Sequence, residues 1–208
     1  VDVRASNIKS SKQGISFDVK FKSDENIYKF KTKLLGVHNV YNILSSLALA
    51  NSFKIDKKKL VESVARIKPV EHRLELKKIG NFYQIDDAFN SNPVGASNAL
   101  DVLDTMPGIK VVVTPGMIEL GKVEYSENKK FGKHIAKVAD KVILVGEKIT
   151  KAIKEGILEE GFNKDNLYVI NDVKESYKMI QNFKENKDIY ALYENDLPDT
   201  YVEKGDKK

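Results

Sequence analysis

Residues 14–35 alternate apolar and polar side chains, with one interruption. The alternation covers residues 14–21 and again 28–35, and the polar segment 23–26 lies between them. Side chains on a strand point to opposite faces in turn, so this pattern predicts a β-hairpin with one buried face.

After Gly36 the apolar residues recur three and four apart, at Val40, Ile43, Leu44, Leu47 and Ala48. That spacing predicts a helix, and Asp56 is the predicted cap of a second helix. A hairpin and two helices contain too few strands for a complete nucleotide-binding domain. We therefore interpret residues 1–69 as part of a larger domain.

Short apolar runs alternate with helix-like segments over the rest of the chain. The runs are residues 83–85, 110–114, 141–145, 167–170 and 189–192. Strands that alternate with helices form parallel sheets covered on both faces, so residues 70–208 are predicted to be a Rossmann-like α/β domain with a parallel-rich sheet. The predicted linker is Lys68-Pro69-Val70, because proline disfavours helix in the residue before it.

Composition narrows the class of protein. The 208 residues contain no cysteine, which excludes disulfides and thiolate metal sites and is typical of the cytoplasm. A run of about twenty apolar residues is absent, so we expect no membrane span. The net charge of +5 comes from lysines interspersed with acids, which we interpret as solvated helix faces and not as a nucleic-acid surface.

Asn39 and Asn42 lie three residues apart at the start of the first predicted helix. Their side chains can therefore point to the same side, where carboxamides suit an adenine or ribose edge. The alternative is that Asn39 caps the helix and Asn42 is a surface residue.

Arg73 directly follows the predicted linker. A guanidinium group binds phosphate through two parallel hydrogen bonds, which lysine does not reproduce. An ion pair with Glu71 or Glu75 is the alternative.

Asp86 and Asp87 end a predicted strand, at the edge where open α/β sheets bind ligands. Neighbouring strand residues point in opposite directions, so at most one of the two faces a given ligand. Residues 90–93 then start a helix, where Asn90 and Asn92 either contact a nucleotide or cap the helix.

Residues 116–123 resemble a phosphate-binding loop of the Walker A type, but they depart from it at two points. Val123 stands where the metal needs a serine or threonine hydroxyl, and Glu119 would repel phosphate. We therefore reject this interpretation.

Residues 36–42, 69–75 and 85–93, in this order and at these intervals, resemble the Mur ligases, ATP-dependent amide-forming enzymes of peptidoglycan precursor synthesis. The Asp-Asp-x-aromatic-Asn-x-Asn-Pro sequence and residues 116–121 are most similar to the branch that adds D-alanyl-D-alanine. The resemblance implies that residues 1–69 end the central ATPase domain and that residues 70–208 are the C-terminal domain.

The resemblance also implies roles for individual residues. It implies ATP contacts from Asn39, Asn42, Arg73, Asp87, Phe89 and Asn90, with a catalytic role for Arg73. Phe89 is either a stacking surface for the base or a packing residue. Asn92 and Glu119 are expected to bind the acceptor.

The family's phosphate loop and magnesium ligands lie upstream of these motifs. We therefore assign no metal ligand to this chain, expect Mg²⁺ and ATP as cofactors of an intact enzyme, and expect the chain alone to be inactive. The implied substrates are a UDP-muramoyl tripeptide and D-alanyl-D-alanine, and we expect a monomer that binds neither nucleic acid nor membrane.

Residues 193–201 depart from the Lys-Gly-Ser-Arg sequence typical of this branch. The alternatives are therefore another ligase of the superfamily, similar to folylpolyglutamate synthetase or to the lipid II amidating subunit, and a non-catalytic module that binds a nucleotide or muropeptide.

Overall fold

The alternating side chains of β2 (Gly14–Phe21) form the buried face of an antiparallel sheet. It pairs with β1 (Val3–Ser11) on one side and with β3 (Ile27–Thr32) on the other. The predicted hairpin is therefore confirmed as β2 and β3. The first strand was missed because most of its side chains are exposed or half-buried.

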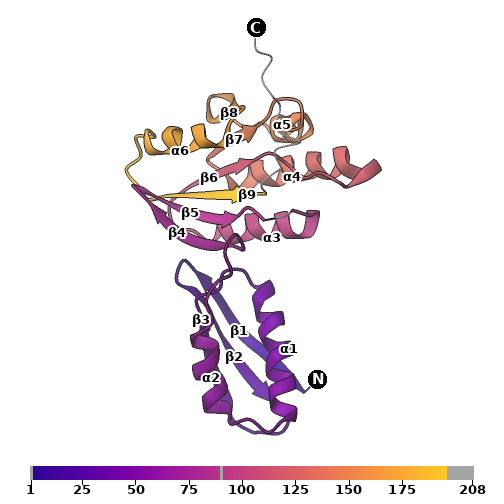
Figure 1. Ribbon diagram of the computed structural model, residues 1–208, viewed down its shortest axis with the longest axis vertical. Helices are drawn as coiled ribbons and strands as arrows, with labels where there is room; N and C mark the ends of the chain where they lie inside the picture. The colour runs from indigo at the N-terminus through magenta and orange to yellow at the C-terminus, as the bar shows by residue number, and fades with distance from the viewer. Residues whose placement is uncertain (1, 90, 196–208) are drawn as a thin grey trace. The chain divides into compact units, whose positions relative to one another are not determined.

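Two helices complete this first unit, α1 (His38–Ser52) and α2 (Lys57–Ala65) (Figure 1). Both were predicted, and the Asp56 side chain caps α2 by accepting a hydrogen bond from the Lys59 amide at 3.1 Å. Their apolar faces join the buried side chains of the sheet in one core, in which Phe17 and Phe30 stack with ring centroids 5.6 Å apart.

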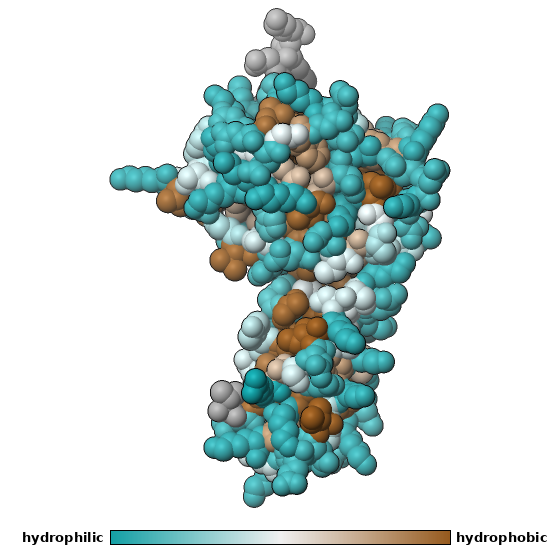
Figure 2. Space-filling view, turned by 180° about the vertical axis from the view of Figure 1, so that it is seen from behind, coloured by the Kyte–Doolittle hydropathy of each residue, from teal (hydrophilic) through white to brown (hydrophobic). Residues whose placement is uncertain are grey.

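The outer side of α1 and the residue that caps its C-terminus, Phe53, are also apolar. Tyr41, Leu49 and Phe53 have 69%, 62% and 72% of their surface exposed, and Figure 2 shows hydrophobic side chains at the surface of this unit. Between α1 and α2 lies an apolar groove of about 330 Å³, which Asn42 helps to line. The helix is thus apolar on two sides, whereas a surface helix normally has one apolar side.

The structure is a computed structural model that describes residues 2–89 and 91–195, and the chain divides into two units between Val70 and Glu71. The second unit contains a six-stranded sheet in the order β4-β5-β9-β6-β7-β8. Its strands are β4 (Glu75–Ile79), β5 (Phe82–Asp87), β6 (Ile109–Thr114), β7 (Lys141–Val145), β8 (Leu167–Ile170) and β9 (Ile189–Glu194). The parallel-rich α/β fold is confirmed, and all five predicted runs are strands.

One strand of this sheet was missed, because β4 contains Lys77 and Lys78 at the sheet edge and pairs antiparallel with β5. The helices are α3 (Pro93–Asp104), α4 (Glu124–Val138), α5 (Lys151–Glu159) and α6 (Val173–Gln181), with the short 3-10 turns η1 (Gly121–Val123) and η2 (Lys164–Asn166). Figure 1 shows α3 and α6 on opposite sides of the sheet. In the described residues, no helix is both long and apolar enough to cross a membrane.

Gly132 and Gly156 allow α4 and α5 to approach each other closely. A Cβ atom added to Gly156 would lie 2.1 Å from the backbone oxygen of Lys129, and one added to Gly132 would lie 2.2 Å from that of Ile153. These contacts are with backbone atoms, so the two helices would have to move apart.

We expect Gly156→Ala to lower the free energy of unfolding by about 1–3 kcal/mol, because the steric cost outweighs alanine's helix propensity. Urea denaturation measures this change. The matched control is Gly95→Ala in α3, where the added Cβ would meet only the Asn92 side chain at 3.4 Å. An equal effect of both substitutions would contradict the steric explanation.

Candidate functional site

Asn39 and Asn42 face each other on the first turn of α1. The Asn42 side chain donates a hydrogen bond to Asn39 Oδ1 at 3.2 Å, and Asn39 donates to the backbone oxygen of Leu35 at 2.7 Å. The helix is capped at Val37 without a side-chain hydrogen bond, so Asn39 is not its cap. The spacing argument that placed both carboxamides on one side is therefore correct.

His38 lies beside this pair, with Nε2 3.2 Å from the Asn39 amide nitrogen. Burial lowers the pKa of His38, which favours its neutral form at physiological pH. A neutral imidazole can exchange a hydrogen bond with Asn39 without adding charge to the site.

Arg73 stacks on Phe89, with the guanidinium carbon 4.1 Å from the ring centroid. Both side chains are exposed. Glu75 pairs with Lys77 at 2.8 Å, and within the described residues neither Glu75 nor Glu71 forms an ion pair with Arg73. The alternative of a structural ion pair is therefore wrong, and the guanidinium edge is available to an anion.

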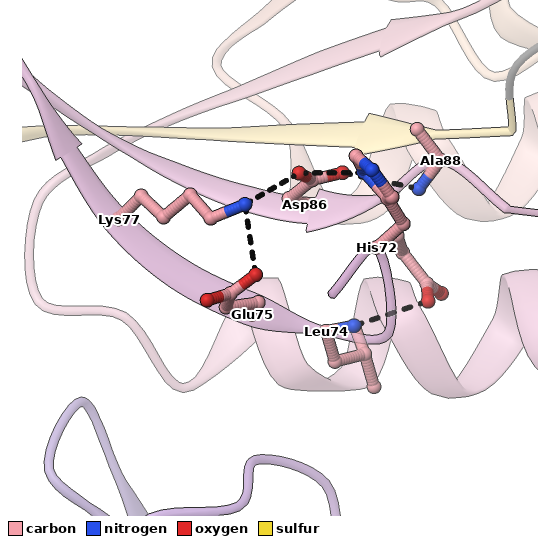
Figure 3. Close-up of polar contacts among 7 residues, drawn as sticks. His72, Leu74, Glu75, Lys77, Asp86 and Ala88 are labelled. Carbon is pink, nitrogen blue, oxygen red and sulfur yellow. Dashed lines mark hydrogen bonds and ion pairs between the residues drawn. The ribbon is translucent and has the colours of Figure 1, made fainter. Parts of the chain in front are cut away.

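Asp86 and Asp87 end β5 and point in different directions, as the strand geometry predicts. Asp86 is buried, and its Oδ2 accepts from His72 Nδ1 at 3.0 Å and from Lys77 Nζ at 3.2 Å (Figure 3). Its Oδ1 accepts from the Ala88 amide at 3.3 Å. Asp86 thus orders the protein around the site and has little capacity left for a ligand.

Asp87 is half-buried, and its Oδ1 accepts a hydrogen bond from the Leu74 amide at 3.1 Å. Burial raises the pKa of Asp87 to about 6, against the opposing effects of that amide and of Arg73. The second oxygen, Oδ2, accepts no hydrogen bond from the described part of the chain. Asp87 can therefore accept a hydrogen bond from a ligand hydroxyl or amine.

The two asparagines at the start of α3, Asn90 and Asn92, were each expected to contact a nucleotide or to cap the helix. Asn92 caps the helix, with Oδ1 accepting from the Gly95 amide at 3.0 Å. Asn90 lies outside the described residues.

The connection from β6 to η1 is held by side chains. The Gly116 amide donates to Thr114 Oγ1 at 3.0 Å, and Asn128 Oδ1 accepts from the Met117 amide at 2.9 Å. These amides are already occupied and cannot cradle phosphate, which supports the rejection of a Walker A loop. Glu119 is exposed and has a φ of +64°.

Sequence reasoning missed Glu194 at the end of β9. This residue is 1% exposed, accepts a hydrogen bond from Ser91, and accepts another from Thr114 Oγ1 at 3.3 Å. Burial raises its pKa to about 7, and the charge of Asp87 acts in the same direction. The sequence signal for this residue was an acidic side chain at the end of an apolar run. It belongs to residues 193–201, which depart from the family sequence, and residues 196–201 of that stretch lie outside the described residues.

Metal binding finds no support within residues 2–89 and 91–195. They contain no group of three or more histidine, aspartate or glutamate side chains placed to hold an ion.

Comparison with known families matches both units. Residues 1–50 match the Mur ligase middle domain, and residues 72–192 match the glutamate ligase domain of the Mur ligases. The chain is 30% identical over 189 residues to the UDP-N-acetylmuramoyl-tripeptide--D-alanyl-D-alanine ligase of Bacillus subtilis. This alignment covers 89% of the chain and 39% of that enzyme.

Solved structures share the fold. MurF from Acinetobacter baumannii matches 93% of the chain and 42% of its own length, with a TM-score of 0.79 and 24% identity. MurF from Thermotoga maritima, solved in complex with ADP, has a TM-score of 0.74 and 17% identity over 93% of the chain and 43% of its own length. The chain thus spans less than half of these proteins, and both its sequence and its fold place it in the Mur ligase family.

Proposed function

We propose that this chain is part of an ATP-dependent ligase that adds D-alanyl-D-alanine to a UDP-muramoyl tripeptide in peptidoglycan precursor synthesis. In this proposal residues 1–69 end the central ATPase domain and residues 70–208 form the C-terminal domain of a cytoplasmic monomer. The observation that carries the proposal is the exposed Arg73 guanidinium, held on Phe89 beside the carboxylate of Asp87. The similarity to the Bacillus ligase supports the choice of acceptor.

ATP, when bound, supplies the phosphoryl group that activates the tripeptide carboxylate for attack by the acceptor amine. The residues of this chain bind and orient. Arg73 offers parallel N–H donors to phosphate oxygens and balances the charge that develops on them. Asp87 Oδ2 can accept a hydrogen bond from a ribose hydroxyl.

The remaining predicted residues fit the same division of roles. Asn39 and Asn42 provide carboxamides for the base or ribose, and the exposed Phe89 ring offers a surface for stacking. Because Asn92 uses Oδ1 for the helix cap, its side-chain amide nitrogen is the group that would meet the acceptor carboxylate. Glu119 would meet the acceptor ammonium group.

The direct test is amide formation by the intact ligase that contains this chain. We expect ATP-dependent product from the UDP-muramoyl tripeptide and D-alanyl-D-alanine, detected by mass spectrometry. Single amino acids offered as acceptors form the comparison series. If product forms only with another amine, the chain belongs to a ligase of another branch of the family. The sequence Tyr193-Glu194-Asn195 favours this alternative, because it departs from the Lys-Gly-Ser-Arg sequence of the D-alanyl-D-alanine-adding branch.

We expect the 208-residue chain alone to release no phosphate from ATP and to form no amide. Charge stabilisation by a phosphate loop and a metal supplies most of the rate in phosphoryl transfer, and the described residues bring together no group of three or more histidine, aspartate or glutamate side chains that could hold a metal ion. A colorimetric phosphate assay with Mg²⁺ measures the rate. Phosphate release by the chain that is lost in an Arg73→Ala variant purified in the same way would contradict this expectation, because release by a contaminant would be unaffected by the substitution.

We expect Glu119→Gln to raise the KM of the intact ligase for the acceptor and to leave its KM for ATP nearly unchanged. Removing one exposed charge contact to an ammonium group corresponds to a change of roughly threefold to tenfold. Steady-state kinetics with each substrate varied in turn separates the two constants. Glu147→Gln, at an exposed acid after β7, is the matched control. An effect on ATP alone would remove Glu119 from the acceptor site.

A further inference from the structure

The end of β9 lies between the two connections that carry the candidate site. In the sheet order, β9 is hydrogen-bonded to β5 on one side and to β6 on the other. Asp87 at the end of β5 pairs in register with Glu194. A side chain at the end of β9 can therefore reach groups that follow both neighbouring strands.

Glu194 makes this reach with its two carboxylate oxygens. Oε1 accepts from the hydroxyl of Ser91, which follows β5, and Oε2 accepts from the hydroxyl of Thr114, which ends β6. Thr114 Oγ1 in turn accepts from the Gly116 amide. One carboxylate thus connects the start of α3 to the backbone of the β6–η1 connection.

The next residue repeats the connection. The Asn195 amide donates to the backbone oxygen of Asp87 at 3.3 Å, and its side chain donates to the backbone oxygen of Gly116 at 2.6 Å. Asn195 adopts a φ of +67°, a conformation that asparagine tolerates better than most residues. Two consecutive residues therefore link the same two segments.

Burying a carboxylate to link two segments costs desolvation free energy and so lowers the stability of the fold. Within the described residues Glu194 has no cationic partner, and the charge of Asp87, which acts on it, has the same sign. Apolar residues of similar volume commonly stabilise a buried position better than a buried charge does. The contacts of Glu194 therefore favour a role in placing the segments over a role in stability.

We infer that Glu194 is a positioning residue of the ligase, which holds Ser91 and the β6–η1 connection in one relative arrangement. This inference rests on the proposed function, in which Asp87 binds the nucleotide and Glu119 binds the acceptor. Asp87 lies in the segment from the end of β5 to Ser91, and Glu119 lies in the β6–η1 connection. Loss of the link changes how the two sides of the site meet while the sheet itself stays folded.

The test is whether a substitution in the segment that contains Ser91 alters hydrogen exchange in the β6–η1 connection, and the reverse, and whether both effects require Glu194. In the 208-residue chain, Ser91→Ala should speed hydrogen exchange of the Gly116 amide by roughly twofold or more, which corresponds to the smallest coupling energy, about 0.5 kcal/mol, of residues that share a network. Thr114→Val should do the same for the Ala88 amide. In a Glu194→Met background, which keeps the volume and removes both acceptors, the two cross effects should disappear.

The control is Tyr193→Phe, which removes a buried hydroxyl bonded to Ser176 at 2.9 Å from the neighbouring position of the same strand. It should leave Gly116 and Ala88 unchanged relative to Val169 in β8. Cross effects that are absent in the single variants, or that persist with Glu194→Met, would overturn the inference. The single variants suffice if Glu194→Met does not fold. An intact ligase without amide-forming activity would overturn the proposed function and leave the exchange result standing.

Discussion

Arg73→Ala in the intact ligase is expected to lower kcat roughly 100-fold, which corresponds to about 3 kcal/mol of transition-state stabilisation. The guanidinium is exposed, is held on the Phe89 ring, and forms no ion pair within 4 Å with an acidic side chain among the described residues. Its loss should change the free energy of unfolding by less than about 1 kcal/mol, the usual value of an exposed cation–π contact. Steady-state kinetics and urea denaturation of the same preparations measure both quantities.

Two further variants separate charge from geometry. Arg73→Lys retains the charge and loses the planar pair of donors, so we expect only partial recovery of kcat. Lys78→Ala is the matched control, because it removes a cation 5.5 Å from the ring centroid of Tyr83 in the same unit. Equal kinetics of the Arg73→Ala and wild-type ligases would leave Arg73 with a packing role only.

The fold could be predicted where periodicity was strong. The alternation in β2 and the apolar runs of the parallel strands each reflect which faces are buried, and burial patterns are visible in a sequence. The strands β1 and β4 escaped prediction because they lie at sheet edges, where exposed polar residues hide the alternation. Strand order is not encoded locally, so the position of β9 between β5 and β6 could not be foreseen.

The candidate site divides in the same way. Arg73, Phe89 and Asp87 lie within a short sequence segment, so the motifs placed them near each other. In the structure Arg73 stacks on Phe89, and its charge acts on Asp87. Glu194 is 103 residues from Ser91 and 80 from Thr114, and only the parallel pairing of β9 with β5 and β6 brings them together. The capping of α3 by Asn92 was one of two readings that the sequence left open.

The pH dependence of stability should reflect the buried carboxyl group of Glu194. Burial raises its pKa from 4.5 to about 7, and burial raises that of Asp87 from 3.8 to about 6. Ser91 and Thr114 offer hydroxyl groups, and Asp87 is the charged group that acts on Glu194. A carboxyl group with a raised pKa binds its proton more tightly in the folded state than in the unfolded state.

The sign of the effect follows from this difference. As pH rises from about 4.5 to about 7, the folded state retains protons that the unfolded state has released, so the free energy of unfolding falls. Above pH 7 the whole cost of the buried charge is present, and it amounts to roughly 3 kcal/mol as an upper value. Asp87 adds a decrease of the same sign at somewhat lower pH.

We therefore expect Glu194→Gln to be more stable than the wild-type chain at pH 8, by up to roughly 3 kcal/mol, and the gain to vanish near pH 4.5. Glutamine keeps the volume and one acceptor while removing the ionisation. Urea denaturation of both proteins at several pH values measures the difference. Glu119→Gln, at an exposed acid in the β6–η1 connection, is the control and should show no such gain. A Glu194→Gln chain that is less stable at pH 8 and equally stable at pH 4.5 would mean that the carboxylate stabilises the fold, and that its burial carries no net cost.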